Sequence, residues 1–417
     1  MKKTLISLAI LACGAAGTTY YAGMEAEKQY QDLVGSLNQQ KGIKARSMKF
    51  ERQFLAGQAQ TRVEFTDEGT LALLKELGMP ASYVLDHQFK HLPWQVDVHT
   101  TLRMTKELAK FKAGFGAVEE PVLLDSTTNL LGQTSFEGRM AMANWSADNG
   151  GKTRFYPLSF TGTFQHRDGQ LAMNASWNGL EMKAADSRLV MSGIKLDEQR
   201  RFTDLGLGVG RSSLTLGALT VNNADGFVGL SAVSMVKDDD VSANGKYRQH
   251  SVLQADELKI NNDRFKALKL DMTLADFDAR ALTKVQKLSN NLLADEGNQV
   301  AADAFLEALL ALLAKGGELQ VDNLSMSAST GELKGQGNIR LKAGELKGIE
   351  SLMGLLNGQF DLQLPKQLGS LEPVDQETLA VLVERGWVRE QGSRISMSFR
   401  IDDKELSVNG QPLASLL

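Results

Sequence analysis

The histidines are the side chains in this sequence best suited to chemistry, and two of them have a suggestive spacing. His87 and His91 stand four residues apart, which on a helix would place both imidazoles on one face, as zinc ligation requires. Pro93 follows closely, and no glutamate lies between the two histidines, so the pair lacks the signature of a zinc protease. We therefore expect solvated or core histidines here and predict no metal site.

Two further motifs resemble ligand sites but fit them poorly. Gly206-x-Gly208-x-Gly210 resembles a dinucleotide fingerprint, yet Arg211 stands where the third glycine belongs and no βαβ pattern surrounds it. Asp238-Asp239-Asp240 lacks the spaced oxygen ligands of a calcium loop, so we expect a flexible turn and a solvated turn at these two places. The sequence contains neither a Gly-x-Ser-x-Gly elbow nor a phosphate-binding loop. We predict a protein that is not an enzyme, with no catalytic residues and no cofactor.

Composition excludes several classes of protein. The chain of 417 residues has 46 basic and 50 acidic side chains, a formal net charge of -4, which argues against a general nucleic-acid binder. Its hydrophobic fraction of 42% is enough to build a sizeable core, which argues against disorder. The single cysteine, Cys13, lies near the amino terminus, so the rest of the chain contains no thiol and no disulfide. If the rest of the chain is exported, its lack of disulfides suits a bacterial periplasm.

The amino terminus predicts a membrane anchor over residues 1–23. Lys2 and Lys3 precede an uncharged run that is long enough, as a helix, to cross or nearly cross a bilayer. The basic end stays in the cytoplasm, so the bulk of the chain is expected in the periplasm, held by a single pass in the inner membrane. The side chains assigned to the anchor are Leu5, Ile6, Leu8, Ile10 and Leu11, with the interfacial aromatics Tyr20 and Tyr21.

Two other fates of this segment stay open. Small residues such as Ala12, Gly14 and Ala15 would permit cleavage as a signal peptide. Lipidation at Cys13 is the third possibility, although the bulky Leu11 fits a lipoprotein signal poorly. A retained anchor is the interpretation we favour.

Glycine-rich turn signals recur along the chain and indicate an antiparallel sheet. Asn-Gly and Asp-Gly pairs supply the positive φ angles that tight hairpins require. They occur at 149–150, 168–169, 225–226, 244–245 and 409–410. Apolar and polar residues alternate in 61–65, 95–99, 140–143, 171–175 and 394–401, a period that predicts half-buried strands.

A finer pattern recurs three times and predicts one apolar sheet face. In each copy the alternation skips two residues, at Gly217-Ala218, Asp256-Glu257 and Asp322-Asn323, so the apolar set changes parity. A β-bulge or bend at the skipped pair restores the facing and adds twist. The residues assigned to this face are Leu214, Leu216, Leu219, Val221, Leu253, Leu258, Ile260, Leu319, Val321, Leu324 and Met326.

Helical patterns interrupt the strands. The main one spans 276–315, where two helices with a break near Glu296-Gly297 are expected to form a hairpin ended by Gly316-Gly317. Further helices are expected at 24–37, 70–77, 105–112, 345–356 and 375–385. The predicted fold class is mainly β with helical insertions (α+β): an extended, strongly twisted antiparallel sheet, curled or half-barrel. We expect a single elongated β-rich periplasmic domain over 24–417 after the anchor.

The whole pattern resembles the YdgA-like family of Gram-negative envelope proteins, a family of unknown function. The resemblance starts with the basic residues, the apolar helix and Tyr20-Tyr21-Ala22-Gly23. It continues through 50–57, where Arg52 matches while Gln53 and Ala56 depart from the family's Gly and Ser. It extends over 244–281 and the closing 405–413. The curled strands also resemble, at fold level only, the AsmA-like proteins, whose grooved sheets are associated with lipid handling.

These observations favour a non-catalytic protein whose curled sheet holds a lipid or another hydrophobic ligand near the inner membrane. The alternative is a structural or interaction protein of the cell envelope that forms a homodimer or binds envelope proteins through exposed sheet edges. An enzyme is the third hypothesis, and it would need a polar pocket with convergent titratable groups. Nucleic acid is not an expected partner.

Overall fold

The computed structural model describes most of the chain beyond its first 29 residues. The described residues are 30–31, 34–35, 37–38, 42–52, 56–76, 79–92, 95–106, 108, 113–116, 118–129, 131–146, 150–184, 186–292, 299–346, 349–367, 376–402 and 405–413. The predicted anchor over 1–23, with Cys13, lies outside them. Within these ranges no helix is both long enough and apolar enough to cross a membrane.

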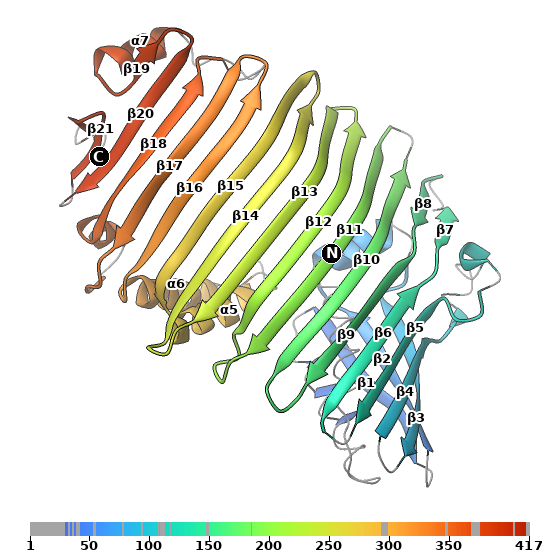
Figure 1. Ribbon diagram of the computed structural model, residues 1–417. Coiled ribbons are helices and arrows are strands. Elements are labelled where there is room, and N and C mark those ends of the chain that lie inside the picture. Colours follow the sequence, from blue (N-terminus) through green and yellow to red (C-terminus); the bar gives the residue numbers. More distant parts are fainter. Residues whose placement is uncertain are drawn as a thin grey trace. The chain divides into compact units, whose positions relative to one another are not determined.

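The structure is mainly β, with 64% of it in strands. It divides into two compact units, Met1–Phe202 (unit 1) and Thr203–Leu417 (unit 2). Every strand pairing among the described residues is antiparallel, and in neither unit does the sheet close on itself (Figure 1).

Unit 1 is a meander with one short detour. Its elements are β1 (Ile43–Arg52), β2 (Ala56–Phe65), α3 (Glu68–Glu76), β3 (Ser82–Leu92), β4 (Gln95–Leu102), the 3-10 turn η1 (Ala113–Phe115), β5 (Val122–Asn129), β6 (Gln133–Met140), β7 (Ala143–Ser146), β8 (Lys152–Phe155), β9 (Leu158–Gln165), β10 (Gln170–Lys183) and β11 (Arg188–Phe202). Strands β1 to β6 pair in sequence order, β6 then pairs with β9, and β10 pairs with β8, β9 and β11.

The main core of unit 1 lies between β1–β4 and the segment that precedes them. Tyr30, Val34 and Leu37 recur at helical spacing and are buried against the sheet. The described residues among 30–38 are helical, as the predicted helix over 24–37 requires. The Asn38 side chain accepts a hydrogen bond from the Ala45 amide at 2.7 Å and donates one to its carbonyl at 2.8 Å, which fixes this segment beside β1.

Unit 2 is a longer meander. Its elements are β12 (Gly208–Asn223), β13 (Gly226–Val241), β14 (Lys246–Ile260), β15 (Asp263–Asp278), α5 (Ala279–Leu292), α6 (Gln299–Leu313), β16 (Gly317–Ala328), β17 (Gly331–Leu341), the 3-10 turn η2 (Ile349–Gly354), β18 (Leu356–Pro365), α7 (Gln376–Glu384), β19 (Arg389–Gln391), β20 (Arg394–Asp402), β21 (Glu405–Val408) and β22 (Gln411–Pro412). Strands β12 to β18 pair in sequence order, β18 and β19 both pair with β20, and β21 and β22 follow.

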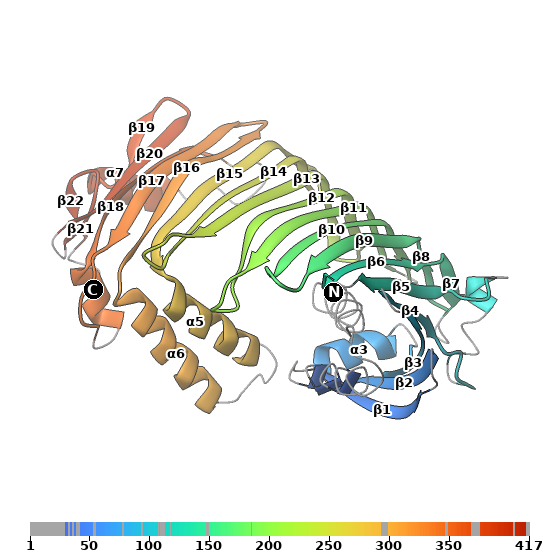
Figure 2. The ribbon, with the colours of Figure 1, turned by 60° about the horizontal axis from the view of Figure 1, so that its bottom comes forward.

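Helices α5 and α6 occupy most of the predicted helical insertion over 276–315. They contact each other, and each contacts β15 near the point where the strand leads into α5 (Figure 2). The link between them, 293–298, lies outside the described residues, and their description as a hairpin stays a prediction. Helix α5 begins where the Asp278 carboxylate accepts a hydrogen bond from the Ala281 amide, an N-cap contact.

Several of the local predictions agree with the structure. The turn prediction is confirmed, because Gly150, Gly169, Gly226, Gly245 and Gly410 all have positive φ. Helices α3 and α7 lie close to the predicted 70–77 and 375–385. Of the predicted 105–112 helix, 107 and 109–112 lie outside the described residues.

Two local predictions are wrong. The described part of 345–356 contains the short 3-10 turn η2 and the start of β18 instead of an α-helix. The strand expected over 140–143 is broken, since β6 ends at Met140 and β7 begins at Ala143. The amide of Ala141 donates a hydrogen bond to the carbonyl of Pro121, next to β5, and the β6–β9 pairing ends at Met140 and Leu158.

Candidate functional site

The register of unit 2 places the predicted apolar residues on one sheet face. One cross-strand row runs through eight strands and contains only apolar residues and a glycine: Leu214, Met235, Leu253, Leu270, Leu324, Gly335, Leu362 and Met397. A second row consists of Leu219, Leu230, Leu258, Phe265 and Ala328. Strand β16 carries Leu324 and Ala328 at an even spacing within one strand, so both rows share a face.

The other predicted residues join the same face by alternation within their strands. Met272 and Leu274 follow Leu270 on β15 and stand opposite Val321 and Leu319. The members placed in this way are Leu216, Val221, Ile260, Leu319, Val321 and Met326. We call the eleven predicted residues, with Val228, Met235, Leu270, Leu362 and Met397, the apolar face.

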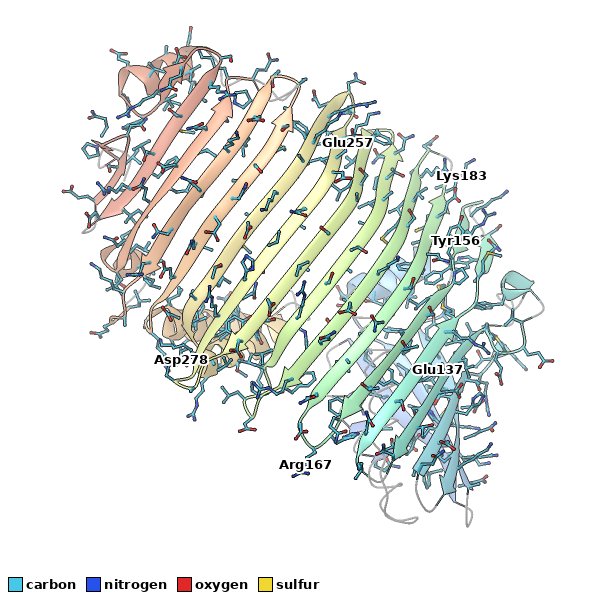
Figure 3. The ribbon with its side chains drawn as sticks, viewed as in Figure 1. Glu137, Tyr156, Arg167, Lys183, Glu257 and Asp278 are labelled. Atoms are coloured by element: carbon cyan, nitrogen blue, oxygen red, sulfur yellow. The ribbon has the colours of Figure 1, made fainter. Side chains whose placement is uncertain are left out.

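The neighbouring row on the opposite side of the sheet is polar along its whole length. It consists of Thr215, Ser234, Gln254, Lys269, Ser325, Lys334, Gln363 and Ser396. Figure 3 shows the side chains along these strands and labels Glu257, which stands opposite Ser231 and Lys266. A sheet with one apolar and one polar face typically buries the apolar face and exposes the polar face to water.

The changes of parity coincide with irregularities in the ladder. The bulge predicted at Asp322-Asn323 is confirmed, because the register shifts between Val321 and Leu324 in the β16–β17 pairing. At the other two predicted places the register is kept but one pair is missing, Gly217 with Ala232 and Asp256 with Ala267. Ala232 and Ala267 have φ of 49° and 51°, a left-handed conformation that is rare for alanine. The left-handed conformation of Ala232 in β13 and of Ala267 in β15 bends each strand, so that the apolar side chains on both sides of the bend stay on one face.

The apolar face is only partly covered. Leu253 is 42% exposed and Val228 45% exposed, and the other predicted residues are half-buried. The contacts of α5 and α6 with the sheet are concentrated on β15. A contiguous apolar surface that stays partly exposed usually marks a place where a ligand or another macromolecule binds.

One end of the apolar face is closed by a polar cluster. The buried carboxylate of Asp239 accepts from the Lys237 ammonium at 2.8 Å and from the Tyr247 hydroxyl at 3.0 Å. The Gln249 side chain lies 2.9 Å from the same hydroxyl and donates to Ser251.

Asp238-Asp239-Asp240 lies inside β13, so the expectation of a solvated turn there is wrong. A flexible turn was also expected at Gly206, Gly208 and Gly210. Gly208 and Gly210 belong to β12, and only Gly206 lies outside a strand.

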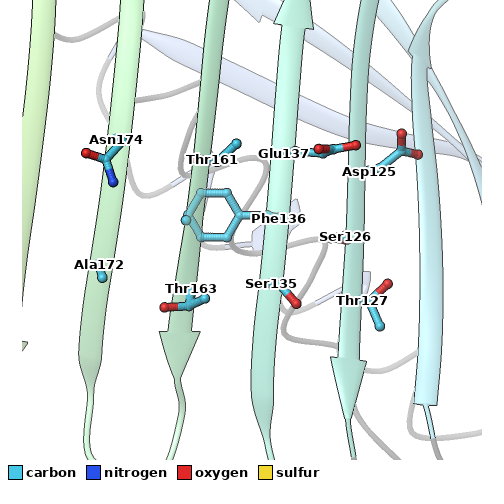
Figure 4. Close-up of a pocket in the computed structure, with 11 residues that line it drawn as sticks. Asp125, Ser126, Thr127, Ser135, Phe136, Glu137, Thr161, Thr163, Ala172 and Asn174 are labelled. Atoms are coloured by element: carbon cyan, nitrogen blue, oxygen red, sulfur yellow. The ribbon is translucent and has the colours of Figure 1, made fainter.

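A shallow hollow in the sheet of unit 1 is a site that the sequence did not suggest. It has a volume of about 490 Å³ and crosses β5, β6, β9 and β10 (Figure 4). Its polar lining includes Asp125, Glu137, Thr161, Thr163 and Asn174, and the small residues Gly162 and Ala172 also line it. Beside it, Asp125 accepts from His99 at 2.6 Å. Burial alone would lower the pKa of His99, but its hydrogen bonds to Asp125 and Glu120 outweigh burial and raise the pKa.

His87 belongs to a buried hydrogen-bonded chain rather than to a metal site. Its Nε2 lies 2.9 Å from the Thr61 hydroxyl, and its Nδ1 lies 2.9 Å from the Thr100 hydroxyl. The Thr61 hydroxyl lies 2.9 Å from that of Tyr30, which donates to the Gln60 carbonyl. The side chain of His91 lies outside the described part of the molecule. Within that part no group of three metal-ligating side chains is found.

Comparison with protein-family models gives one match over almost the entire chain. The matching model is DUF945, described as a bacterial protein of unknown function, and the match covers residues 1–415. No curated protein and no solved structure matches the chain.

Proposed function

The chain belongs to the DUF945 family, and from that premise we propose that it is a non-catalytic protein of the bacterial envelope, anchored in the inner membrane with its bulk in the periplasm. Its apolar face in unit 2 binds a lipid or another hydrophobic ligand. The YdgA-like resemblance and the fold-level resemblance to AsmA-like proteins are part of this proposal.

The observation that carries the proposal is the pair of neighbouring rows in unit 2, one entirely non-polar and one entirely polar. An acyl chain offers only CH₂ groups, each of which contributes about 0.8 kcal/mol when it is buried. A row of Leu and Met side chains matches that chemistry along its whole length. The polar cluster around Asp239 and Lys237 limits the face at one end, as an amphiphilic ligand requires.

An anchor that ends at Gly23 would lie close in the chain to the core of unit 1. Tyr30 is buried in the core of unit 1, and only six residues separate it from Gly23, the end of the uncharged run. Gly23 and Tyr30 are seven residue steps apart, so even a fully extended chain places them at most about 25 Å apart. An anchored chain would therefore hold β1–β4 close to the membrane surface, where lipid is the most abundant hydrophobic ligand.

The test compares two adjacent residues that lie on opposite faces of β14. The full chain, extracted from membranes in mild detergent, is analysed by native mass spectrometry, and bound molecules are identified after organic extraction. We expect co-purifying phospholipid with the natural sequence and with Gln254→Asp, and its loss with Leu253→Asp. Equal lipid content in all three proteins would contradict the assignment of the apolar face.

The alternative function is that of an envelope interaction protein, acting as a homodimer or with protein partners. Such a protein would pair with its partners through an exposed sheet edge. The edge strand β1 carries Lys44, Arg46 and Lys49 and a bulge between Ser47 and Lys49, features that oppose strand addition. A defined dimer without lipid in the same mass spectra would favour this alternative.

A further inference from the structure

Two arginines face each other across the edge of the unit 1 sheet. Arg46 of β1 stands directly opposite Arg62 of β2, and both side chains are exposed. Like charges in directly opposed positions destabilise a sheet. The pair therefore lowers the stability of the isolated fold, so its presence needs an explanation other than stability.

Among the described residues, the salt bridges close to this pair join other side chains. Lys49 is bound to Glu51 at 2.8 Å, and Arg103, the next arginine in the row, is bound to Asp86 at 2.8 Å. Arg46, Arg62 and Arg103 belong to one cross-strand row. Arg62 stands opposite Val84, and the Val84 carbonyl accepts a hydrogen bond from the Arg103 amide. Among the described residues, neither Arg46 nor Arg62 has a carboxylate within ion-pair distance.

An exposed methionine lies beside the arginine pair. Met48 occupies the bulge of β1, between Ser47 and Lys49, and is 51% exposed. The bulge thus presents an apolar side chain next to the two arginines. Cations that bind phosphate, next to an apolar group that enters the acyl boundary, are the combination by which peripheral surfaces bind anionic membranes.

We propose that Arg46 and Arg62 bind the phosphates of anionic phospholipid head groups, with Met48 inserted beside them, so that β1 and β2 rest on the membrane surface. Guanidinium groups suit this role because each can form paired hydrogen bonds to phosphate oxygens. Bound phosphate would also relieve the repulsion between the two arginines. The inference rests on the proposed anchor, which tethers Tyr30, and with it the neighbouring β1, close to the bilayer.

Position within the chain selects a membrane over a soluble phosphate compound. The Tyr30 ring lies 5.5 Å from that of Phe50 on β1, and Asn38 is hydrogen-bonded to Ala45 on the same strand. Tyr30 and Asn38 are thus packed on β1 itself, on the face opposite that of Arg46. At this short tether the local concentration of head groups is high whatever the affinity of a free ligand.

Methionine oxidation tests the proposal in the full chain. The protein is reconstituted in nanodiscs of phosphatidylcholine, with or without phosphatidylglycerol, and treated with dilute peroxide. Oxidation of Met48 is followed by mass spectrometry, with Met142, which is 46% exposed, as the internal control. We expect phosphatidylglycerol to slow oxidation of Met48 by roughly fivefold or more, the factor that one basic side chain contributes at an anionic surface. Oxidation of Met142 stays unchanged.

Arg62→Glu is the decisive variant, because it replaces the repulsion with Arg46 by an attraction and so does not endanger the fold. It should abolish the protection of Met48, whereas Arg264→Glu, the same change of charge on an exposed side chain of unit 2, should preserve it. Protection that survives Arg62→Glu overturns the proposal. Protection by inorganic phosphate in phosphatidylcholine nanodiscs overturns the lipid source in favour of a soluble ligand.

The proposed function and this inference fail differently. A chain that does not enter nanodiscs at all refutes the anchor, and the inference falls with it. A chain that enters them and shows the same Met48 oxidation in both lipids refutes the inference alone.

Discussion

At the scale of single residues, the buried chain from Gln60 to Thr100 is the most constrained part of unit 1. A consistent set of donors runs from the Thr100 hydroxyl to His87 Nδ1, from His87 Nε2 to Thr61, from Thr61 to Tyr30 and from Tyr30 to the Gln60 carbonyl. It satisfies every polar atom with a neutral imidazole. Satisfied networks of this kind favour one arrangement of a core.

Protonation of His87 should therefore unfold the protein more readily. Burial lowers the pKa of His87 from 6.5 to about 4, an effect only partly opposed by the nearby Asp86 carboxylate. The unfolded chain then binds the proton more tightly than the native state, so stability present above pH 6.5 is lost as the pH falls toward 4. The loss amounts to about 3 kcal/mol at the acid end. Urea unfolding at intervals between pH 7.5 and 4.5 measures it.

His87→Gln provides the control for this titration. It keeps a hydrogen-bonding side chain but cannot be protonated, so its free energy of unfolding should be lower at pH 7.5 and should change less on acidification. An unchanged slope between pH 6.5 and 4.5 would assign the acid sensitivity to other groups.

At the scale of elements, two glycines of unit 1 make room for two aromatic rings. Phe136 stands opposite Gly162, and Gly138 stands opposite Phe160, in the same β6–β9 pairing. A Cβ at Gly162 would lie 2.4 Å from the Phe136 ring, and one at Gly138 would lie 2.2 Å from the Phe160 ring. The rings therefore lie over bare backbone.

Alanine at either of these glycines should destabilise unit 1. Gly138→Ala and Gly162→Ala should each cost about 1–3 kcal/mol through overpacking, measured by thermal or urea unfolding. Gly35→Ala is the matched control, because it lies in the helical segment and nothing lies within 4 Å of its added Cβ. A loss of stability as large in Gly35→Ala would mean that steric conflict at the rings is not the cause.

At the parity changes of unit 2, replacing alanine by glycine should raise the stability of the protein instead of lowering it. Ala232 and Ala267 are held at positive φ inside strands, a conformation that costs alanine but not glycine. Ala232→Gly and Ala267→Gly should stabilise the protein by about 0.5–1 kcal/mol. Ala255→Gly, at a buried strand position of ordinary φ, should destabilise it. Differential scanning calorimetry distinguishes the two signs, and destabilisation by all three changes would contradict this account.

Local signals explain which elements the sequence predicted well. Asn409-Gly410 and Asn244-Gly245 are predictable as turns because an Asn-Gly pair is a local signal, and Gly410 and Gly245 have the positive φ that it indicates. The bulge at Asp322-Asn323 was predicted because parity is visible within one strand. The 3-10 turn at Ile349–Gly354 was missed because no periodicity separates it from an α-helix.

At the scale of the whole molecule, the two units differ in how they use apolar residues. Unit 1 buries Tyr30, Val34 and Leu37 against its first strands, whereas the eleven predicted residues of unit 2 stay half-buried or exposed. Unit 2 should therefore bind an apolar dye in its native state. We expect anilinonaphthalene sulfonate fluorescence with delipidated protein, and a decrease when Leu253→Asp and Val228→Asp are combined.

Leu131 supplies the comparison for this measurement. It is 79% exposed but lies between β5 and β6, away from any apolar row, so Leu131→Asp should leave the fluorescence unchanged. An equal decrease with Leu131→Asp would show that the dye reports scattered surface residues and not the apolar face.

The candidate sites show what the sequence could reveal about the molecule. The eleven apolar residues were found because each set alternates within its own strand. The Arg46–Arg62 pair was not found, because residues sixteen positions apart meet only through the register of β1 and β2. The hollow beside Asp125 combines residues from four strands for the same reason.

The meander of unit 2 bears on how the chain is assembled as it is made. From β12 to β18 each strand pairs with its neighbour in sequence, and most connections are tight turns. Contacts that are local in sequence form quickly, since little loop entropy is lost for each added strand. A chain delivered from its amino-terminal end can thus add one hairpin strand after another while the remainder is still emerging, with a single growing edge to be protected at any moment.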